Sequence, residues 1–177
     1  MSDVLVFEPR RSRGWLSLLL LALVVLACTV PVVFAATRGD VPWWVGLLMG
    51  ALGLGLGVPF LVLAFWFPTM RYELDDSALT LRYGPVLAYR IPLDEVQAIE
   101  RRDLRLSWWS SVRLPGLALF AVPYRGMGQV KMCATAAATG ILLIETAGDV
   151  YGITPADEVG LRTALQERRG RSISSVI

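Results

Sequence analysis

The chain has 177 residues, of which 55% are hydrophobic, and its mean hydropathy is +0.55. These values are too apolar for an ordinary soluble domain. A net charge of only +2 argues against nucleic acid as the main partner, because that function needs a clearly basic face. The sequence has no histidine, which removes the commonest general base and metal ligand.

The apolar excess lies in two uncharged runs, 15–36 and 45–67. Each run is long enough for a helix to cross the ~30 Å hydrocarbon core of a bilayer at ~1.5 Å per residue. A helix also satisfies its own backbone hydrogen bonds, which hydrocarbon cannot do. The segment 37–44 between the runs contains Arg, Gly, Asp and Pro, which favour a tight turn. The pattern therefore predicts two transmembrane helices joined by an outer turn.

Arginines indicate which side of the membrane is cytoplasmic. Three of them, at positions 10, 11 and 13, precede the first run, Arg71 follows the second, and the turn contains Arg38 alone. The positive-inside rule then predicts a multi-pass protein of the cell membrane with both termini, including a tail over 1–14, in the cytoplasm. The alternative is a signal peptide cleaved after Val33-Phe34-Ala35, but the first run is too long for a typical signal core and a second run follows directly.

Four glycines of the second run, Gly46, Gly50, Gly53 and Gly57, are spaced four, three and four residues apart. This spacing places them on one helix face, where another helix backbone can approach closely. Packing against the first helix is the simplest interpretation, and self-association through this face is the alternative. A dinucleotide-binding loop is excluded, because no strand precedes the glycines and no phosphate-binding lysine follows.

From 69 to 170 the pattern changes to short runs that alternate between apolar and polar residues. This period of two is typical of β-strands. Thr154 and Pro155 can begin a final helix, Leu161 and Leu165 give it an apolar stripe, and Gly170 can end it. We expect 171–177 to be a tail. Seven strands are predicted, at about 71–74, 79–83, 86–91, 97–104, 130–136, 140–145 and 150–153.

Seven short strands and a closing helix are the element order of a pleckstrin-homology (PH) domain. The chain resembles the bacterial PH-like family whose domains follow one or two membrane helices. Three segments carry the resemblance: 71–76 leading into Leu79, 89–96, and 141–157, where an Ile-Thr-Pro-x-Asp junction enters the last helix. The resemblance implies a barrel of two bent sheets plugged by a helix, with an interaction role and no catalysis.

The segment 105–129 is long for a connection between two strands, and long loops tend to be functional or disordered. Its aromatic and apolar residues are interleaved with arginines, as suits the headgroup zone of a bilayer or a partner surface. The alternative is that its apolar residues close the barrel. The candidate contact residues are Arg105, Trp108, Trp109, Arg113, Leu117, Phe120, Tyr124 and Arg125.

No pattern in the sequence indicates catalysis, a metal site or a cofactor. There is no Gly-x-Ser-x-Gly elbow, no histidine to activate a serine, and no metal-ligand spacing. Asp75 and Asp76 occupy the first strand turn, where their carboxylates would repel a phosphoinositide. Arg101 and Arg102 offer a small anionic-lipid patch; the alternative is a solvated strand end, because acidic residues flank them at 100 and 103. The sequence thus predicts a membrane-tethered PH-like module that binds protein partners or itself, or alternatively one that senses anionic lipid.

Overall fold

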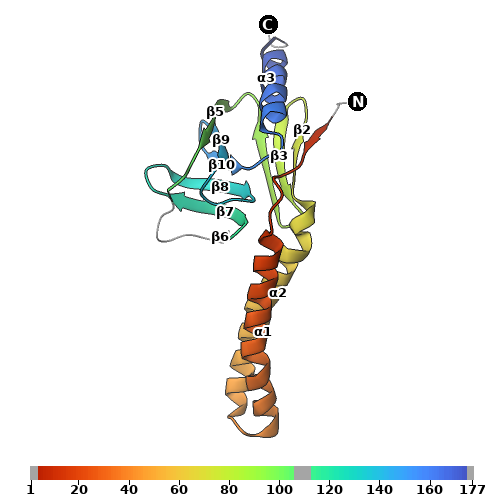
Figure 1. Ribbon diagram of the computed structural model, residues 1–177, viewed down its shortest axis with the longest axis vertical. Helices are drawn as coiled ribbons and strands as arrows, with labels where there is room; N and C mark the ends of the chain where they lie inside the picture. Colours follow the sequence, from red (N-terminus) through yellow and green to blue (C-terminus); the bar gives the residue numbers. More distant parts are fainter. Residues whose placement is uncertain (1–3, 106–112, 175–177) are drawn as a thin grey trace. The chain divides into compact units, whose positions relative to one another are not determined.

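The structure is a computed structural model that describes residues 4–105 and 113–174, with the side chains of 4–105 and 114–170 (Figure 1). The chain forms two compact units. Gly14–Phe67 makes the first, and the residues on either side of it make the second. The predicted fold class is confirmed: two long apolar helices accompany a β-rich domain with two sheets and a C-terminal helix.

The first unit is a helical hairpin. Helix α1 (Gly14–Arg38) and helix α2 (Trp43–Trp66) are long and apolar enough to cross a membrane, judged by length and composition. The turn between them is closed by hydrogen bonds from the backbone N–H groups of Gly39 and Asp40 to carbonyl groups in the last turn of α1. Gly39 has a φ of 82°, a left-handed conformation that glycine adopts without steric cost.

The second unit contains ten strands among the described residues, in two sheets that are followed by helix α3 (Glu158–Ser174). The first sheet has the order β1-β2-β3-β4 and the second has the order β5-β9-β10-β8-β7-β6. A short 3-10 turn, η1 (Phe67–Thr69), precedes β2. The strands are β1 (Leu5–Phe7), β2 (Arg71–Leu74), β3 (Ala78–Tyr83), β4 (Leu87–Pro92), β5 (Val96–Arg102), β6 (Arg113–Leu114), β7 (Leu117–Tyr124), β8 (Gly128–Ala134), β9 (Ile141–Thr146) and β10 (Val150–Ile153).

Tyr72 joins the two sheets inside the domain. Its side chain is fully buried, and its hydroxyl donates to the carbonyl oxygen of Cys133 in β8 at 2.8 Å. The same hydroxyl accepts from the backbone N–H of Thr154, just after β10, at 3.3 Å. Burial raises the pKa of the Tyr72 hydroxyl, which therefore stays protonated and can donate. One side chain thus connects strand β2 to two strands of the other sheet.

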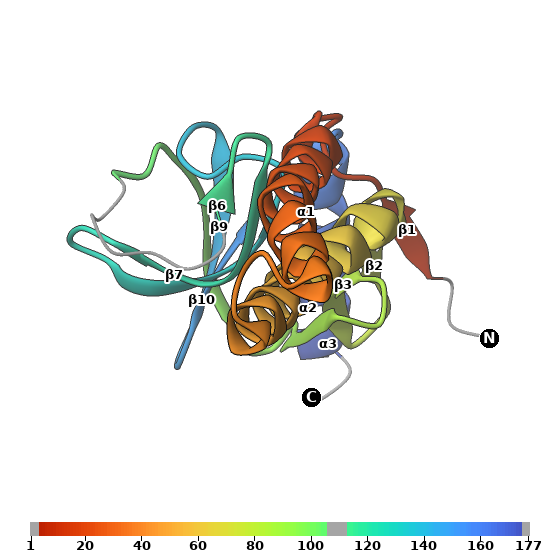
Figure 2. The same cartoon turned by 90° about the horizontal axis from the view of Figure 1, so that it is seen from below.

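The N-terminal residues are the first departure from the sequence prediction. The sequence predicted a tail over 1–14, but β1 lies beside β2 (Figure 2) and pairs with it in antiparallel register, with Leu5 opposite Leu74. Beyond β1, the backbones of Glu8 and Arg10 bond to the β10–α3 junction, and Ser12 Oγ donates to the carbonyl of Gly116 at 2.6 Å. We refer to residues 4–13 as the N-terminal strap. The expected tail is therefore part of the domain.

The segment 105–129 is the second departure. Each of the seven predicted strands has a counterpart, but β6 and β7 were missed because this segment was expected to be a loop. Strand β7 pairs with β8 from Ala118 opposite Ala134 to Tyr124 opposite Gly128. Leu117, Ala118 and Leu119 are all fully buried, so no alternation of apolar and polar residues marked the strand.

Candidate interaction site

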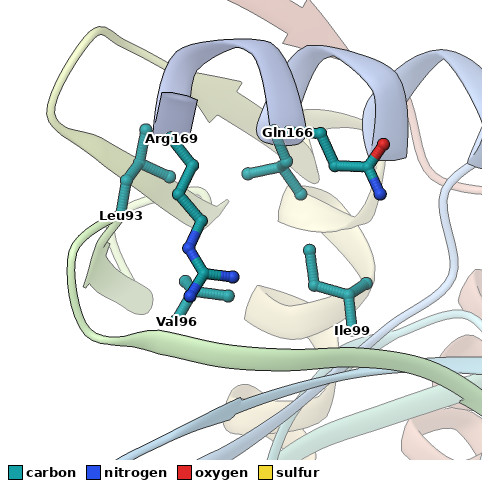
Figure 3. Close-up of a pocket in the computed structure, with 6 residues that line it drawn as sticks. Leu93, Val96, Ile99, Gln166 and Arg169 are labelled. Carbon is teal, nitrogen blue, oxygen red and sulfur yellow. The ribbon is translucent and has the colours of Figure 1, made fainter. Parts of the chain in front are cut away.

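A cavity of about 120 Å³ lies between helix α3 and the start of strand β5. Three of its lining side chains come from 93–99 and three from α3 (Figure 3). The side chain of Arg169 extends from the helix toward the segment that carries Val96 (Figure 3). The lining residues are Leu93, Val96, Ile99, Leu165, Gln166 and Arg169.

Local hydrogen bonds hold the strand side of the cavity. The backbone N–H of Leu93 donates to the carbonyl of Ser77 at 2.9 Å, and that of Glu95 donates to the carbonyl of Pro92 at 3.3 Å. Together they form a tight connection between β4 and β5 in which Leu93 and Val96 are buried. The strand wall of the cavity is therefore fixed by the fold.

The helix side is held at both ends of α3. Asp157 Oδ1 accepts from the backbone N–H of Gly160 at 2.8 Å, which caps the first turn. Near the other end, Arg168 is buried and donates to the carbonyl of Leu74 at 3.0 Å, with Asp76 Oδ1 at 3.3 Å. Arg169 is the next residue, and its side chain lines the cavity.

Strand β5 is an edge strand of its sheet. It pairs with β9 on one side, and no described residue pairs with its other side. The register shifts between Val96 and Ala98, which is the mark of a β-bulge. A bulge changes the phase of side-chain alternation, so Val96 and Ile99, three residues apart, both line the cavity.

Arg169 differs from the arginines around it because no carboxylate of the described residues forms an ion pair with it. Arg101 and Arg162 both pair with Glu158, at 3.4 and 2.9 Å, and Arg102 pairs with Glu100. Arg169 is half-buried and lies against an apolar cavity. It thus brings a positive charge to the cavity that is not neutralised by an ion pair there.

The predicted contact residues of 105–129 are split between surface and core. Arg105 and Arg125 are exposed and are joined by a backbone hydrogen bond of 3.2 Å. Leu117 and Tyr124, which were expected to contact a membrane or partner, are buried instead, and the hydroxyl of Tyr124 donates to Ala137 at 2.6 Å. Trp108 and Trp109 lie outside the described residues, as does the side chain of Arg113.

Phe120 has a strained backbone. Its φ of 66° is left-handed, and it is the one described residue other than glycine with a positive φ. This conformation costs roughly 1–2 kcal/mol for an ordinary side chain. Phe120 is half-buried in the middle of β7, opposite Met132. Strand β7 therefore stays paired with β8 at a position where its backbone conformation is unfavourable.

The glycines of α2 face α1. A Cβ atom added to Gly46 would clash with that of Ala36, and one added to Gly53 would lie 2.6 Å from Thr29 Oγ1. Gly50 and Gly57 have looser surroundings, with the nearest atoms of α1 at 3.7 and 3.6 Å. An apolar groove of about 620 Å³ runs along this part of the hairpin, lined by residues that include Gly46 and Gly50.

In the turn between β2 and β3, the carboxylate of Asp75 stabilises the turn itself. Asp75 Oδ1 accepts hydrogen bonds from the backbone N–H groups of Ser77 and Ala78 at 2.7 and 2.6 Å, and from the Ser77 hydroxyl at 2.8 Å. Desolvation by itself raises the pKa of Asp75, but these bonds outweigh it and hold the pKa below its usual value. Asp75 therefore stays ionised at a turn where a phosphoinositide headgroup would need positive charge.

No pattern in the sequence indicates the surroundings of Lys131, the sole lysine. Its Nζ is 2.6 Å from Asp149 Oδ2 and lies 5.5 and 6.0 Å from the ring centroids of Tyr151 and Tyr89. The bond to Asp149 raises the pKa of Lys131, so the amine stays charged. Because Tyr89 belongs to β4 and Lys131 to β8, this cluster ties together the two sheets at the domain surface.

The part of the chain that the structure describes contains no group of three or more cysteine or acidic side chains placed to hold a metal ion. Burial raises the pKa of Cys133 to about 12, so its thiol is protonated near neutral pH and unsuited to nucleophilic attack. The arrangement offers surfaces for binding and no constellation for a reaction among these residues.

The comparison with protein families gives one match. The family model described as "Bacterial PH domain" matches residues 70–169, which are 100 of the 177 residues. No curated protein and no solved structure matches the chain. The matched segment runs from just before β2 to Arg169 in α3, and it leaves out the N-terminal strap and both long helices. By this match, and by its two sheets with a closing helix, the chain belongs to the bacterial PH domain family.

Proposed function

We propose that this chain is a multi-pass protein of the cell membrane whose PH domain lies in the cytoplasm with both termini and binds a protein partner without catalysis. The cavity beside the open edge of β5 carries the proposal, because it combines an apolar site with free backbone groups and a positive charge. These are features of peptide recognition at sheet edges. PH domains in general serve as interaction modules.

The pairing of β1 with β2 supports an even number of membrane crossings. Strand β1 precedes α1, whereas β2 follows α2, and the two strands are hydrogen-bonded neighbours. Both ends of the hairpin must then emerge on the same side of a bilayer, and the flanking arginines favour the cytoplasmic side. Cleavage after Ala35 would cut the covalent link between the N-terminal strap and the domain to which it is hydrogen-bonded.

Reporter fusions test the topology. Alkaline phosphatase is active only outside the cytoplasm, so we expect activity when it is fused after Asp40 in the turn and none when it is fused after Ile177. The opposite pattern would contradict the cytoplasmic placement of the domain.

Photo-crosslinking in intact cells tests partner binding. A photoreactive residue at Gln166 should give adducts with another protein, and one at Glu167, which is exposed on α3 but does not line the cavity, should give fewer. A third probe at Arg125 reports on the β7–β8 turn. Absence of protein adducts from all three positions would count against a protein-binding role.

A second copy of the chain is one partner that the proposal allows. The groove along the helical hairpin remains lined by small and apolar residues after α1 and α2 have packed together, which suits a further helix. Crosslinking between differently tagged copies would detect this, and substitution of Gly50 by Leu should weaken it. Adducts that do not respond to this substitution would argue against self-association through the groove.

Binding of anionic lipid is a second candidate function, favoured by the convergence of two arginines on Gly140. Guanidinium nitrogens of Arg10 and Arg101 lie 3.1 and 3.2 Å from the position of a Cβ atom built on Gly140. However, Glu158 pairs with Arg101, and Asp103 accepts a hydrogen bond from the backbone of Gly140. These carboxylates offset much of the positive charge, which is why we place lipid binding second.

Nanodiscs of anionic or neutral lipid separate the two functions. If the domain senses anionic lipid, hydrogen exchange over 105–129 should slow on anionic discs, reverse in high salt, and no longer respond when Trp108, Trp109 and Arg113 are replaced by Ala. Equal exchange on both kinds of disc would exclude lipid sensing through this segment and leave the protein-partner proposal in place.

A further inference from the structure

The cavity between β5 and α3 has the size of one side chain. Its volume of about 120 Å³ is close to the ~150 Å³ of an engineered apolar cavity that holds one benzene molecule. Leu93, Val96, Ile99 and Leu165 make its walls apolar, while Gln166 and Arg169 supply its polar groups. An aliphatic side chain can pack against the four apolar residues, while Gln166 and Arg169 remain available for polar contacts.

The backbone beside the cavity is available for pairing. Strand β5 has β9 on one side and no described partner on the other, so its unpaired N–H and C=O groups can bond to an added strand. The bulge at Val96 occurs at the point where the strand borders the cavity. Bulges at sheet edges re-aim side chains and often accompany binding sites.

The positive charge of Arg169 favours an acidic residue in a bound segment, close to the side chain that enters the cavity. Arg169 is the one ionised group that lines the cavity, and no described carboxylate forms an ion pair with it. In an extended segment, residues i and i+2 point to the same side and lie about 7 Å apart. A carboxylate two residues from the buried aliphatic side chain could therefore reach the guanidinium group.

We infer that the cavity binds an extended segment of a partner protein that adds a strand to β5, inserts an aliphatic side chain, and pairs an Asp or Glu two residues away with Arg169. This inference rests on the proposed function, because it specifies the kind of partner that the domain binds. Asp94 and Glu95, on the nearby β4–β5 connection, disfavour further acidic residues in the segment and limit the motif to one carboxylate.

Selection from a random heptapeptide phage library tests the inference. The library is panned on the full-length protein in nanodiscs and counter-selected on empty discs. We expect enriched peptides to share Val, Leu or Ile with Asp or Glu two positions away. Replacement of Ile99 by Arg, which fills the cavity, should weaken binding of these peptides at least tenfold.

Charge reversal provides the decisive variant, because Arg169 is half-buried and its substitution leaves the apolar walls intact. Panning on Arg169→Glu should replace the acidic residue of the motif by Lys or Arg. Arg125→Glu, which reverses an exposed arginine on the β7–β8 turn, should leave the motif unchanged. The inference is overturned if no peptide is enriched, if the motif ignores Arg169→Glu, or if Ile99→Arg binds as tightly as the parent. Protein adducts in the crosslinking experiment alongside any of these results would refute the motif and leave the proposed function standing.

Discussion

The helical hairpin and the β-rich domain hold themselves together in opposite ways. In the hairpin, the closest approaches occur where side chains are missing, at Gly46 against Ala36 and at Gly53 against Thr29. In the domain, the decisive contacts are made by a large side chain with a polar tip, Tyr72, which bonds to both Cys133 and Thr154. The first unit depends on small residues and the second on satisfied buried hydrogen bonds.

This contrast follows from the chemistry of each unit. Hydrocarbon supplies no hydrophobic force between apolar helices, so close packing through glycine is the main source of stability for a pair that spans a membrane. The domain excludes water from its core, and a polar group buried there without a partner lowers the stability of the domain. Substitutions should therefore act on the two units by different mechanisms.

The largest effect is expected at Tyr72. Replacement by Ala removes a fully buried ring and should lower the free energy of unfolding of the domain by ~3–5 kcal/mol. Tyr72→Phe keeps the ring but leaves the N–H of Thr154 and the C=O of Cys133 without this partner, at ~1–3 kcal/mol. Hydrogen exchange at strand amides of the full chain measures both, and a neutral Tyr72→Phe would show that the hydroxyl does not hold the sheets together.

Next in size is a glycine substitution in the hairpin. Gly53→Leu should weaken the α1–α2 packing by ~1–3 kcal/mol, because Thr29 occupies the space that a side chain needs. Gly55→Leu is the matched control, since a Cβ atom there has no neighbour within 4 Å and the change should be nearly neutral. Thermal denaturation in detergent compares the two, and equal losses would place the helix contact elsewhere.

Alkaline pH should weaken the domain and spare the hairpin. The folded pKa of Cys133 is raised to about 12 from its ordinary value of 9.0, because its thiol is buried. A raised pKa contributes stability that is fully present below pH 9.0 and is lost as pH rises from there toward 12, at most ~1.4 kcal/mol per pH unit from this group. The free energy of unfolding of the domain should fall less steeply with rising pH in Cys133→Ala than in the parent. An unchanged slope would mean that other groups cause the loss of stability, such as Tyr72 and Tyr83, whose pKa values are also raised.

The smallest effect is expected at Lys131. Lys131→Met keeps a long apolar chain beside the rings of Tyr89 and Tyr151 but removes the ion pair with Asp149. Both charged groups are partly exposed, and such pairs contribute about 0–1 kcal/mol. A loss of unfolding free energy well above this range, measured by denaturant titration, would mean that Lys131 contributes substantially to joining the two sheets.

The accuracy of the sequence prediction also divides between the two units. A continuous apolar run shows directly where a long helix begins and ends. The expected spans of 15–36 and 45–67 therefore begin and end within a few residues of α1 and α2. Alternation marked seven strands but failed for β7, where Leu117, Ala118 and Leu119 are buried in succession. A local pattern carries no such signal when both faces of a strand are covered.

Two further features depend on contacts between residues far apart in the chain. Strand β1 has only three residues, and its partner β2 begins more than sixty positions later, so nothing local distinguished it from a tail. The cavity likewise combines 93–99 with three residues of α3. In the sequence, 105–129 was the candidate interaction surface, whereas the cavity arises only when the fold brings these separate segments together.

The N-terminal strap also dictates an order of events during synthesis. Leu5 leaves the ribosome long before Leu74, its partner in the sheet, and both long helices are made in the interval. The first sheet therefore cannot be completed until both helices have been synthesised, so β1 waits for its partner strand while the whole hairpin is made. For the same reason, one proteolytic nick in the turn between the helices would leave the two products held together by the β1–β2 ladder.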